Sequence, residues 1–138
     1  MFDDQANLAV SFYKAVETGN LDELDRILSP SWKETPPAYP GQADGAEGYK
    51  PVVQAFKTAF PDGTFQLEEV ISSEDKVVVR TTVTGTHAGT FLGVPATGKK
   101  VTFGTIDIHQ ISNHQIVQSW HIEDFYALLQ QIAPGRLA

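Results

Sequence analysis

The first half of the chain places apolar residues at the three- and four-residue spacing that is typical of amphipathic helices. This spacing predicts a first helix over residues 2–18 and a second over 20–28, with Asn20 positioned to cap the second. A third helix is expected over 45–60. Residues 31–44 carry several prolines between these helices and predict a loop that wraps over a core.

The second half alternates apolar and polar residues with a period of two, which indicates strands. The expected strands are 64–72, 76–88, 100–111 and 115–123, joined by turns at 73–75 and 112–114 and by a longer connection at 88–99. A short helix is expected to follow at 125–132. Helices followed by strands predict an α+β fold, with three N-terminal helices packed on a curved antiparallel sheet that encloses a pocket.

Composition narrows the class of protein further. A chain of 138 residues suits a single domain spanning 1–138. Its net charge of −7 is unfavourable for binding nucleic acid. The acidic start and the lack of a long apolar run indicate neither a signal peptide nor a membrane partner, so a cytoplasmic location is expected. The absence of cysteine removes thiolate nucleophiles and cysteine-based zinc sites.

Three short motifs in the second half resemble a known family. They are GTHAGTFLGVPATGK at 85–99, Trp120-x-x-x-Asp124, and Leu128-Leu129-Gln130-Gln131. Together they are similar to the SnoaL-like polyketide cyclases and ester cyclases, within the nuclear transport factor two like superfamily. The resemblance implies a cone-shaped α+β barrel, no cofactor, and Asp124 as the acid/base of an intramolecular aldol ring closure. The chain departs from the family pattern at Glu34 and Gln110.

The residues themselves favour a site at the last hairpin. If Asn113-His114 is a two-residue turn, Asp107 pairs with Trp120, and one face presents Asp107, His109, Trp120 and Asp124. A carboxylate beside an indole and away from water has a raised pKa, so we expect Asp124, beside Trp120, to act as the base that removes a proton next to a substrate carbonyl. His87, His109 or Gln110 would then donate to the enolate. The expected substrate-binding residues are Trp32, Tyr49, Phe56, Phe91, Asp107, Gln110 and Trp120.

Each of these residues has a simpler structural interpretation. Asp124 stands where it can cap the helix at 125–132, and Asn in its place would cap equally well without serving as a base. Asp107 and His109 suit a subunit interface as well as a pocket. His87 suits a structural bond within the loop, and the large apolar area of Trp120 suits the core.

The leading function is a cofactor-free cyclase or isomerase that acts on a carbonyl-bearing, mostly apolar small molecule. The alternative is a non-catalytic module that binds a small hydrophobic ligand or dimerises, and epoxide or ester hydrolysis is a third possibility. A homodimer is expected.

The run at 93–100 nearly spells a phosphate-binding loop but leads into a strand, and His121-x-Glu123 lacks the cysteines of a zinc deaminase, so we expect no metal or nucleotide.

Overall fold

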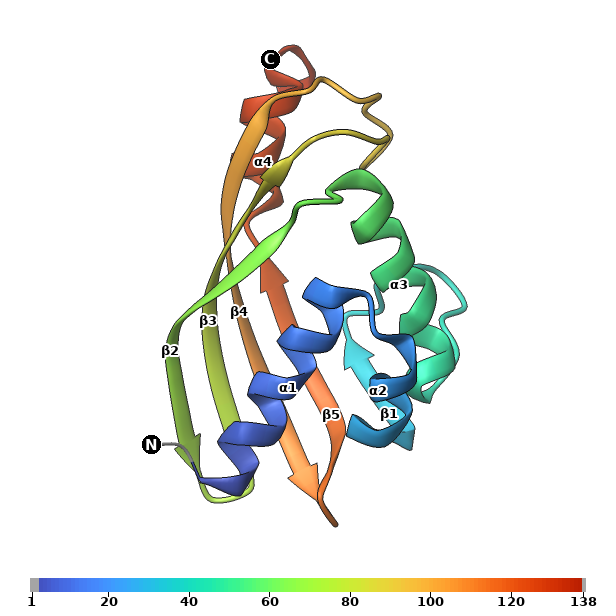
Figure 1. The fold of residues 1–138 in the computed structure, drawn as a ribbon, viewed down its shortest axis with the longest axis vertical. Coiled ribbons are helices and arrows are strands. Elements are labelled where there is room, and N and C mark those ends of the chain that lie inside the picture. Colours follow the sequence, from blue (N-terminus) through green and yellow to red (C-terminus); the bar gives the residue numbers. More distant parts are fainter. Residues whose placement is uncertain (1–2, 138) are drawn as a thin grey trace.

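Within residues 3–137, the part of the chain that the computed structural model describes, four α-helices and one short 3₁₀-helix form (Figure 1). The α-helices are α1 (Asp4–Thr18), α2 (Leu21–Ile27), α3 (Gly45–Ala59) and α4 (Phe125–Ile132), and the 3₁₀-helix spans Pro134–Leu137. All four α-helices lie where the sequence predicts them. The expected start of the first helix at Phe2 lies outside the described residues. Of the helices in residues 3–137, none has the length and apolar character to cross a membrane.

Polar residues directly before the first two helices cap the backbone N–H groups of their first turns. The Asp3 carboxylate accepts a hydrogen bond from the backbone N–H of Ala6 at 2.7 Å. The Asn20 side chain accepts one from Glu23 at 3.3 Å, as the capping rule predicts. Between them, Gly19 adopts a φ of 70°, which favours glycine. This turn lets α1 and α2 lie on the same side of the sheet (Figure 1).

Five strands form one sheet. They are β1 (Leu28–Thr35), β2 (Thr64–Ser73), β3 (Lys76–Thr86), β4 (Lys100–Ser112) and β5 (Gln115–Glu123), in the spatial order β1-β5-β4-β3-β2. Strands β2 to β5 form the predicted antiparallel meander, with bounds close to those expected.

Strand β1 corrects the prediction of a loop from residue 31. It pairs in parallel with β5, so the sheet is mixed and not purely antiparallel. Pro30 obscures this strand in the sequence, yet an edge strand tolerates proline because its outer N–H groups have no partner strand. Leu28 and Trp32 are buried from this strand, although its pairing with β5 is irregular between Leu28 and Lys33.

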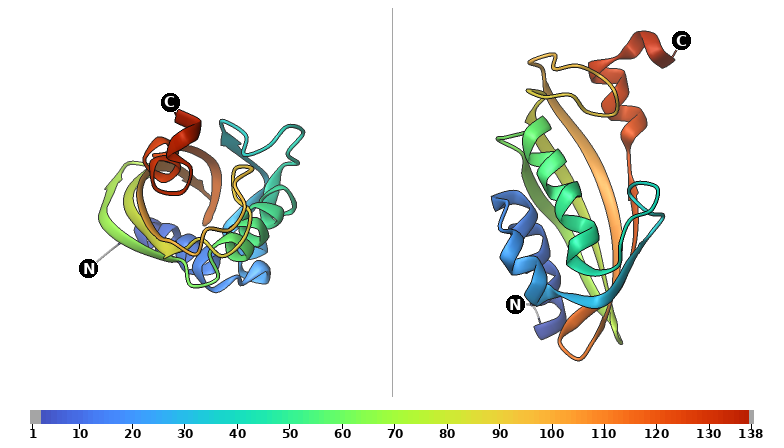
Figure 2. Two further views of the ribbon diagram at one scale, coloured as in Figure 1. Left: turned by 90° about the horizontal axis from the view of Figure 1, so that it is seen from above. Right: turned by 90° about the vertical axis from the view of Figure 1, so that its right-hand side faces the viewer.

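The sheet is strongly curved but not closed, which corrects the expectation of a barrel. Its two edges are β1 and β2, and the view from above shows the strands curling into an incomplete ring (Figure 2). Helices α1 and α3 lie across the concave side, while α4 lies near one end of the sheet (Figures 1 and 2). The buried core lies between these helices and the concave face.

A β-bulge in the last hairpin decides which residues of β5 face inward. Asn113 and His114 form the predicted two-residue turn, both with positive φ, and Ile111 pairs with Ile116 as expected. The next pair, however, is Gln110 with Gln118, so Val117 is an extra residue in β5.

Beyond the bulge, the register differs by one residue from the predicted one. Asp107 pairs with His121 and not with Trp120, which instead pairs with Ile108. Because side chains alternate along a strand, this shift exchanges the two faces of β5. His121 and Glu123 face the helices with Asp107, and Trp120 faces away from them.

Candidate active site

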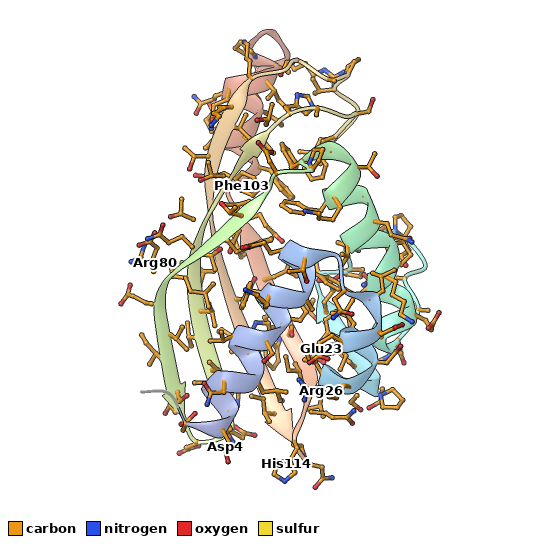
Figure 3. The ribbon with its side chains drawn as sticks, viewed as in Figure 1. Asp4, Glu23, Arg26, Arg80, Phe103 and His114 are labelled. Atoms are coloured by element: carbon orange, nitrogen blue, oxygen red, sulfur yellow. The ribbon has the colours of Figure 1, made fainter. Side chains whose placement is uncertain are left out.

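A cavity of about 610 Å³ lies between the helices and the concave face of the sheet. Aromatic rings form most of its wall: Phe12, Tyr13, Trp32, Tyr39, Tyr49, Phe56, Phe65, Phe91, Phe103 and Phe125. Phe103 is one of the β4 side chains that face the cavity, while Arg80 on β3 projects from the opposite side of the sheet (Figure 3). The volume and the apolar wall fit a small, mostly apolar organic molecule.

A chain of hydrogen bonds between buried side chains ends at the carboxyl group of Asp107. The Trp32 indole N–H donates to Ser119 Oγ at 3.0 Å, and Ser119 Oγ lies 2.7 Å from His109 Nδ1. His109 Nε2 lies 2.8 Å from the Tyr13 hydroxyl oxygen. The Tyr13 hydroxyl in turn donates to Asp107 Oδ2. We call these five residues the Asp107 relay.

The direction of every bond in the Asp107 relay follows from two of its members. An ionised Asp107 has no proton, so Tyr13 must donate to it. Burial lowers the pKa of His109 to about 3, and its ring is therefore neutral and carries one N–H. That proton must lie on Nε2 to reach Tyr13, and Nδ1 then accepts from Ser119. The relay thus points all of its donors toward Asp107.

Asp107 has the properties of an acid/base group at neutral pH. Burial raises its pKa to about 7, although the Tyr13 hydrogen bond opposes this, and the nearby charge of Glu123 adds to the rise. Only 7% of the residue is exposed, yet it lines the cavity. Oδ2 is occupied by Tyr13, while Oδ1 has no hydrogen-bond partner among residues 3–137. Oδ1 is therefore the oxygen available to a ligand.

A second polar group in the cavity wall ties β5 to the chain that follows β1. His121 Nδ1 lies 2.7 Å from Glu123 Oε1, and its Nε2 lies 2.6 Å from the Pro36 carbonyl oxygen. Burial acts to lower the pKa of His121, but the hydrogen bond and charge of Glu123, the Pro36 carbonyl and Glu34 outweigh it and raise the pKa to about 9. His121 is thus a cation with both nitrogens engaged. Burial raises the pKa of Glu34, whose Oε1 accepts from Gln42 at 2.7 Å.

Several residues expected from the sequence meet at this cavity. The wall includes Trp32, Tyr49, Phe56, Phe91, Asp107 and His109. The alternative that Asp107 and His109 lie at a subunit interface does not fit their position, because both side chains are buried on the concave face. His109 has no free nitrogen for a ligand, and it contacts Asp107 only through Tyr13.

Other expected site residues lie elsewhere. Trp120 is on the convex face and 37% exposed, so its predicted place in the core is wrong. Gln110 donates to Asp75 Oδ2 at 2.9 Å in the neighbouring turn, away from the cavity. His87 is buried beside the cavity but does not line it, and its Nδ1 lies 2.9 Å from Thr97 Oγ1. His87 therefore matches its structural interpretation as a bond within the 88–99 connection.

Asp124 is exposed, which corrects the expectation of a buried aspartate beside Trp120. Its carboxylate accepts from the backbone N–H of Ala127 at 3.0 Å and caps α4. The residue does not line the cavity. The side chain thus occupies the capping position that the sequence allowed, and the buried carboxyl lies on β4 instead.

We expect Asp124→Asn to leave both stability and turnover close to those of the unsubstituted protein, because Asn caps a helix as well as Asp. Asp124→Ala should lower the free energy of unfolding by about 1 kcal/mol through loss of the cap. Thermal unfolding and steady-state rates check both results. A large loss of turnover in Asp124→Asn, with stability retained, would return the role of base to this residue.

Sequence reasoning missed Tyr13, Ser119, Glu34, His121 and Glu123 as members of the site. Tyr13 lies in the first predicted helix, whose apolar spacing indicated burial but no chemistry. A hydroxyl group on an otherwise apolar buried face needs a hydrogen-bond partner. The presence of Tyr13 on that face was therefore the sequence signal that a buried polar group lies opposite the first helix. Ser119, His121 and Glu123 alternate along one strand, but their face depends on the bulge at Val117.

A curved sheet with helices on its concave face and an aromatic cavity between them defines the nuclear transport factor two like fold. Solved structures agree with this. TsrD from Streptomyces laurentii is 27% identical with a TM-score of 0.86, covering 96% of this chain and 98% of that chain. IdmH from Streptomyces antibioticus is 25% identical with a TM-score of 0.80, covering 92% and 96%. A SnoaL-like polyketide cyclase from Agrobacterium tumefaciens, 18% identical with a TM-score of 0.79 and covering 96% and 100%, shares the fold.

The model of the SnoaL-like polyketide cyclase family matches residues 7–132. This match runs from within α1 to the end of α4 and includes all five strands of the described residues. The chain therefore belongs to the SnoaL-like polyketide cyclase family. None of the curated proteins matches the chain significantly.

Proposed function

We propose that this protein is a cofactor-free cyclase that uses Asp107 as acid and base on a carbonyl-bearing, mostly apolar small molecule. The observation that carries the proposal is a buried carboxyl with one free oxygen in an aromatic cavity and a pKa of about 7. A base is most effective when its pKa lies near the working pH. Membership of a family of polyketide cyclases supports the same chemistry.

The proposed reaction is an intramolecular aldol addition. Asp107 Oδ1 takes the proton from a carbon next to a carbonyl group, and the electrons of the broken C–H bond form an enolate. The enolate carbon attacks a second carbonyl of the same molecule, which makes a C–C bond and an alkoxide. The alkoxide takes the proton back from Asp107, so the protein returns to its starting state without an oxidant or reductant.

The first step can be tested without the natural substrate. Bicyclic ketones such as 2-tetralone have acidic C–H groups beside the carbonyl, and NMR in D₂O measures the exchange of these hydrogens. The protein should accelerate exchange for some members of a panel of such ketones. If no member of the panel exchanges faster than in buffer, the proposal fails.

A second proposal concerns the convex face of the sheet, which we propose pairs with a second copy of this chain. Large apolar side chains lie exposed there, with Ile122 70% exposed and Ile71 52% exposed. Ile106 and Trp120 extend the same patch across β4 and β5. Patches of this kind on soluble domains mark interaction sites, and a two-fold axis would cover the patch with its own copy.

We expect Ile106→Lys to convert a dimer to a monomer, because it places a charge within an apolar interface, where the charge would lose its water. Light scattering with size-exclusion chromatography reports the mass. Gln54→Lys, on the exposed face of α3, is the matched control and should leave the mass unchanged. A wild-type protein that is monomeric at micromolar concentration would contradict the proposed pairing.

A further inference from the structure

The cavity offers a ligand a side-chain donor that the rest of the protein does not use, the hydroxyl group of Tyr49. Among residues 3–137, no hydrogen bond to this hydroxyl is present, although Tyr49 lines the cavity. The other donors in the wall are engaged. Trp32 donates to Ser119, Tyr39 to the Gly48 carbonyl, and Thr105 shares a bond with Thr81.

The basic side chains of the wall offer a ligand no further hydrogen-bond donor. Both ring nitrogens of His121 are engaged by Glu123 and by the Pro36 carbonyl, and both of His109 by Ser119 and Tyr13. No Lys or Arg belongs to the described cavity lining. A carbonyl oxygen that enters the cavity therefore finds one uncommitted side-chain donor, Tyr49, in a wall that also presents Asp107 Oδ1, a carboxyl oxygen without a hydrogen-bond partner among residues 3–137.

The Tyr49 ring is held firmly in place. It packs against Phe12 with ring centroids 5.2 Å apart and against Trp32 edge-on at 5.4 Å. Phe12 also contacts the His109 ring at 5.2 Å, so Tyr49 and the Asp107 relay share a wall. At Gly48, an added Cβ would lie 1.7 Å from the Ala43 carbonyl oxygen, and this close approach fixes the helix turn that carries Tyr49.

Tyr49 keeps its proton at every physiological pH. Burial raises the pKa of its hydroxyl well above the usual value, and the neighbouring charges of Glu34, Asp107 and Glu123 raise it further. A phenol in this state donates a hydrogen bond to an oxyanion but does not give up its proton. Such a donor stabilises an enolate in the transition state more than the neutral ketone.

We infer that Tyr49 is a catalytic residue, whose hydroxyl donates to the substrate carbonyl oxygen while Asp107 Oδ1 removes the adjacent proton. This inference rests on the proposed function. As the C–H bond breaks, its electron pair forms the C=C bond of the enolate, and the carbonyl π electrons move to the oxygen that Tyr49 holds. The site thereby selects a carbonyl compound whose acidic carbon is next to the held carbonyl.

Binding of two shape-matched probes tests the donor without any reaction. The first, 2-naphthol, has an oxygen where the enolate of 2-tetralone has one, and the second, 2-methylnaphthalene, has a methyl group there. Tyr49→Phe should weaken 2-naphthol binding by roughly tenfold and leave 2-methylnaphthalene binding unchanged. Tyr126→Phe is the matched control, since Tyr126 is 62% exposed and outside the cavity. Unchanged preference for 2-naphthol in Tyr49→Phe would overturn the inference.

Exchange of the 2-tetralone hydrogens tests the catalytic role. Tyr49→Phe should lower kcat by roughly 10² to 10³ with a smaller change in KM, as when one oxyanion donor is removed. A wild-type kcat in this variant would overturn the inference while leaving Asp107 as the base. If instead the wild type accelerates exchange for no ketone of the panel but the naphthol preference depends on Tyr49, the proposed function fails and the assignment of the ligand donor stands.

Discussion

Asp107→Asn is expected to lower the turnover of the protein by roughly 10² to 10⁴, the usual contribution of a positioned acid/base group. Asn keeps an oxygen that accepts from Tyr13, so the Asp107 relay retains its hydrogen bonds. It cannot take a proton at neutral pH. Deuterium exchange of a bicyclic ketone, followed by NMR for the variant and the wild type at one pH, measures the loss.

Stability measurements provide the control for Asp107→Asn. A carboxyl whose folded pKa is raised to about 7 is protonated more readily in the folded than in the unfolded state. Its contribution to stability is therefore present at low pH and is lost as the pH rises from about 4 to about 7. Asn does not titrate, so the difference in stability between variant and wild type should move in favour of the variant from pH 4 to pH 8. A folded variant with full turnover would exclude Asp107 as the base.

Tyr13→Phe is expected to shift the pH dependence of turnover to higher pH. The Tyr13 hydroxyl donates to Asp107 and holds its pKa below the value that burial alone would give. Without it the pKa rises above about 7, and the carboxylate that acts as base forms only at higher pH. Rates should fall at pH 7 and recover partly in alkaline buffer, which a pH profile of kcat/KM records.

Tyr13→Phe should also lower the free energy of unfolding. Removal of the hydroxyl leaves the buried Nε2–H of His109 without an acceptor, at a cost of about 1–3 kcal/mol. The ring itself is retained, so its packing against Phe12, at 5.2 Å between centroids, remains. Urea unfolding compares Tyr13→Phe with Tyr126→Phe, whose exposed hydroxyl has no such role. A Tyr13→Phe protein with wild-type stability and an unshifted pH profile would show that the relay does not act on Asp107.

The periodic spacing of apolar residues predicted most of the helices and strands of the fold. The spacing of apolar residues predicted α1 to α4, and alternation predicted β2 to β5, because each of these elements buries one face. Strand β1 escaped prediction since Pro30 lies within it and since its parallel partner, β5, is far away in the sequence. Whether the curved sheet closes depends on twist summed over all strands, which no local pattern reports.

The site was predicted less well than the fold, for reasons that concern single residues. The sequence identified the last hairpin as a source of chemistry, and Asp107 and His109 indeed lie in the cavity. It assigned the base to Asp124 because local spacing could not separate a capping carboxylate from a buried one. Tyr13 and Asp107 are 94 residues apart, and their hydrogen bond depends on how α1 lies across the sheet.

The extra residue at Val117 shifts the alternation of all later side chains in β5 by one position. Every side chain beyond it exchanges inside for outside, so one residue of backbone decides whether His121 and Glu123 or Trp120 face the cavity. His121 and Glu123 add polar groups to an otherwise aromatic wall, whereas Trp120 in their place would add another apolar ring. In related sequences, the chemical character of the cavity therefore cannot be assigned from the alternation of β5 until its bulge has been located.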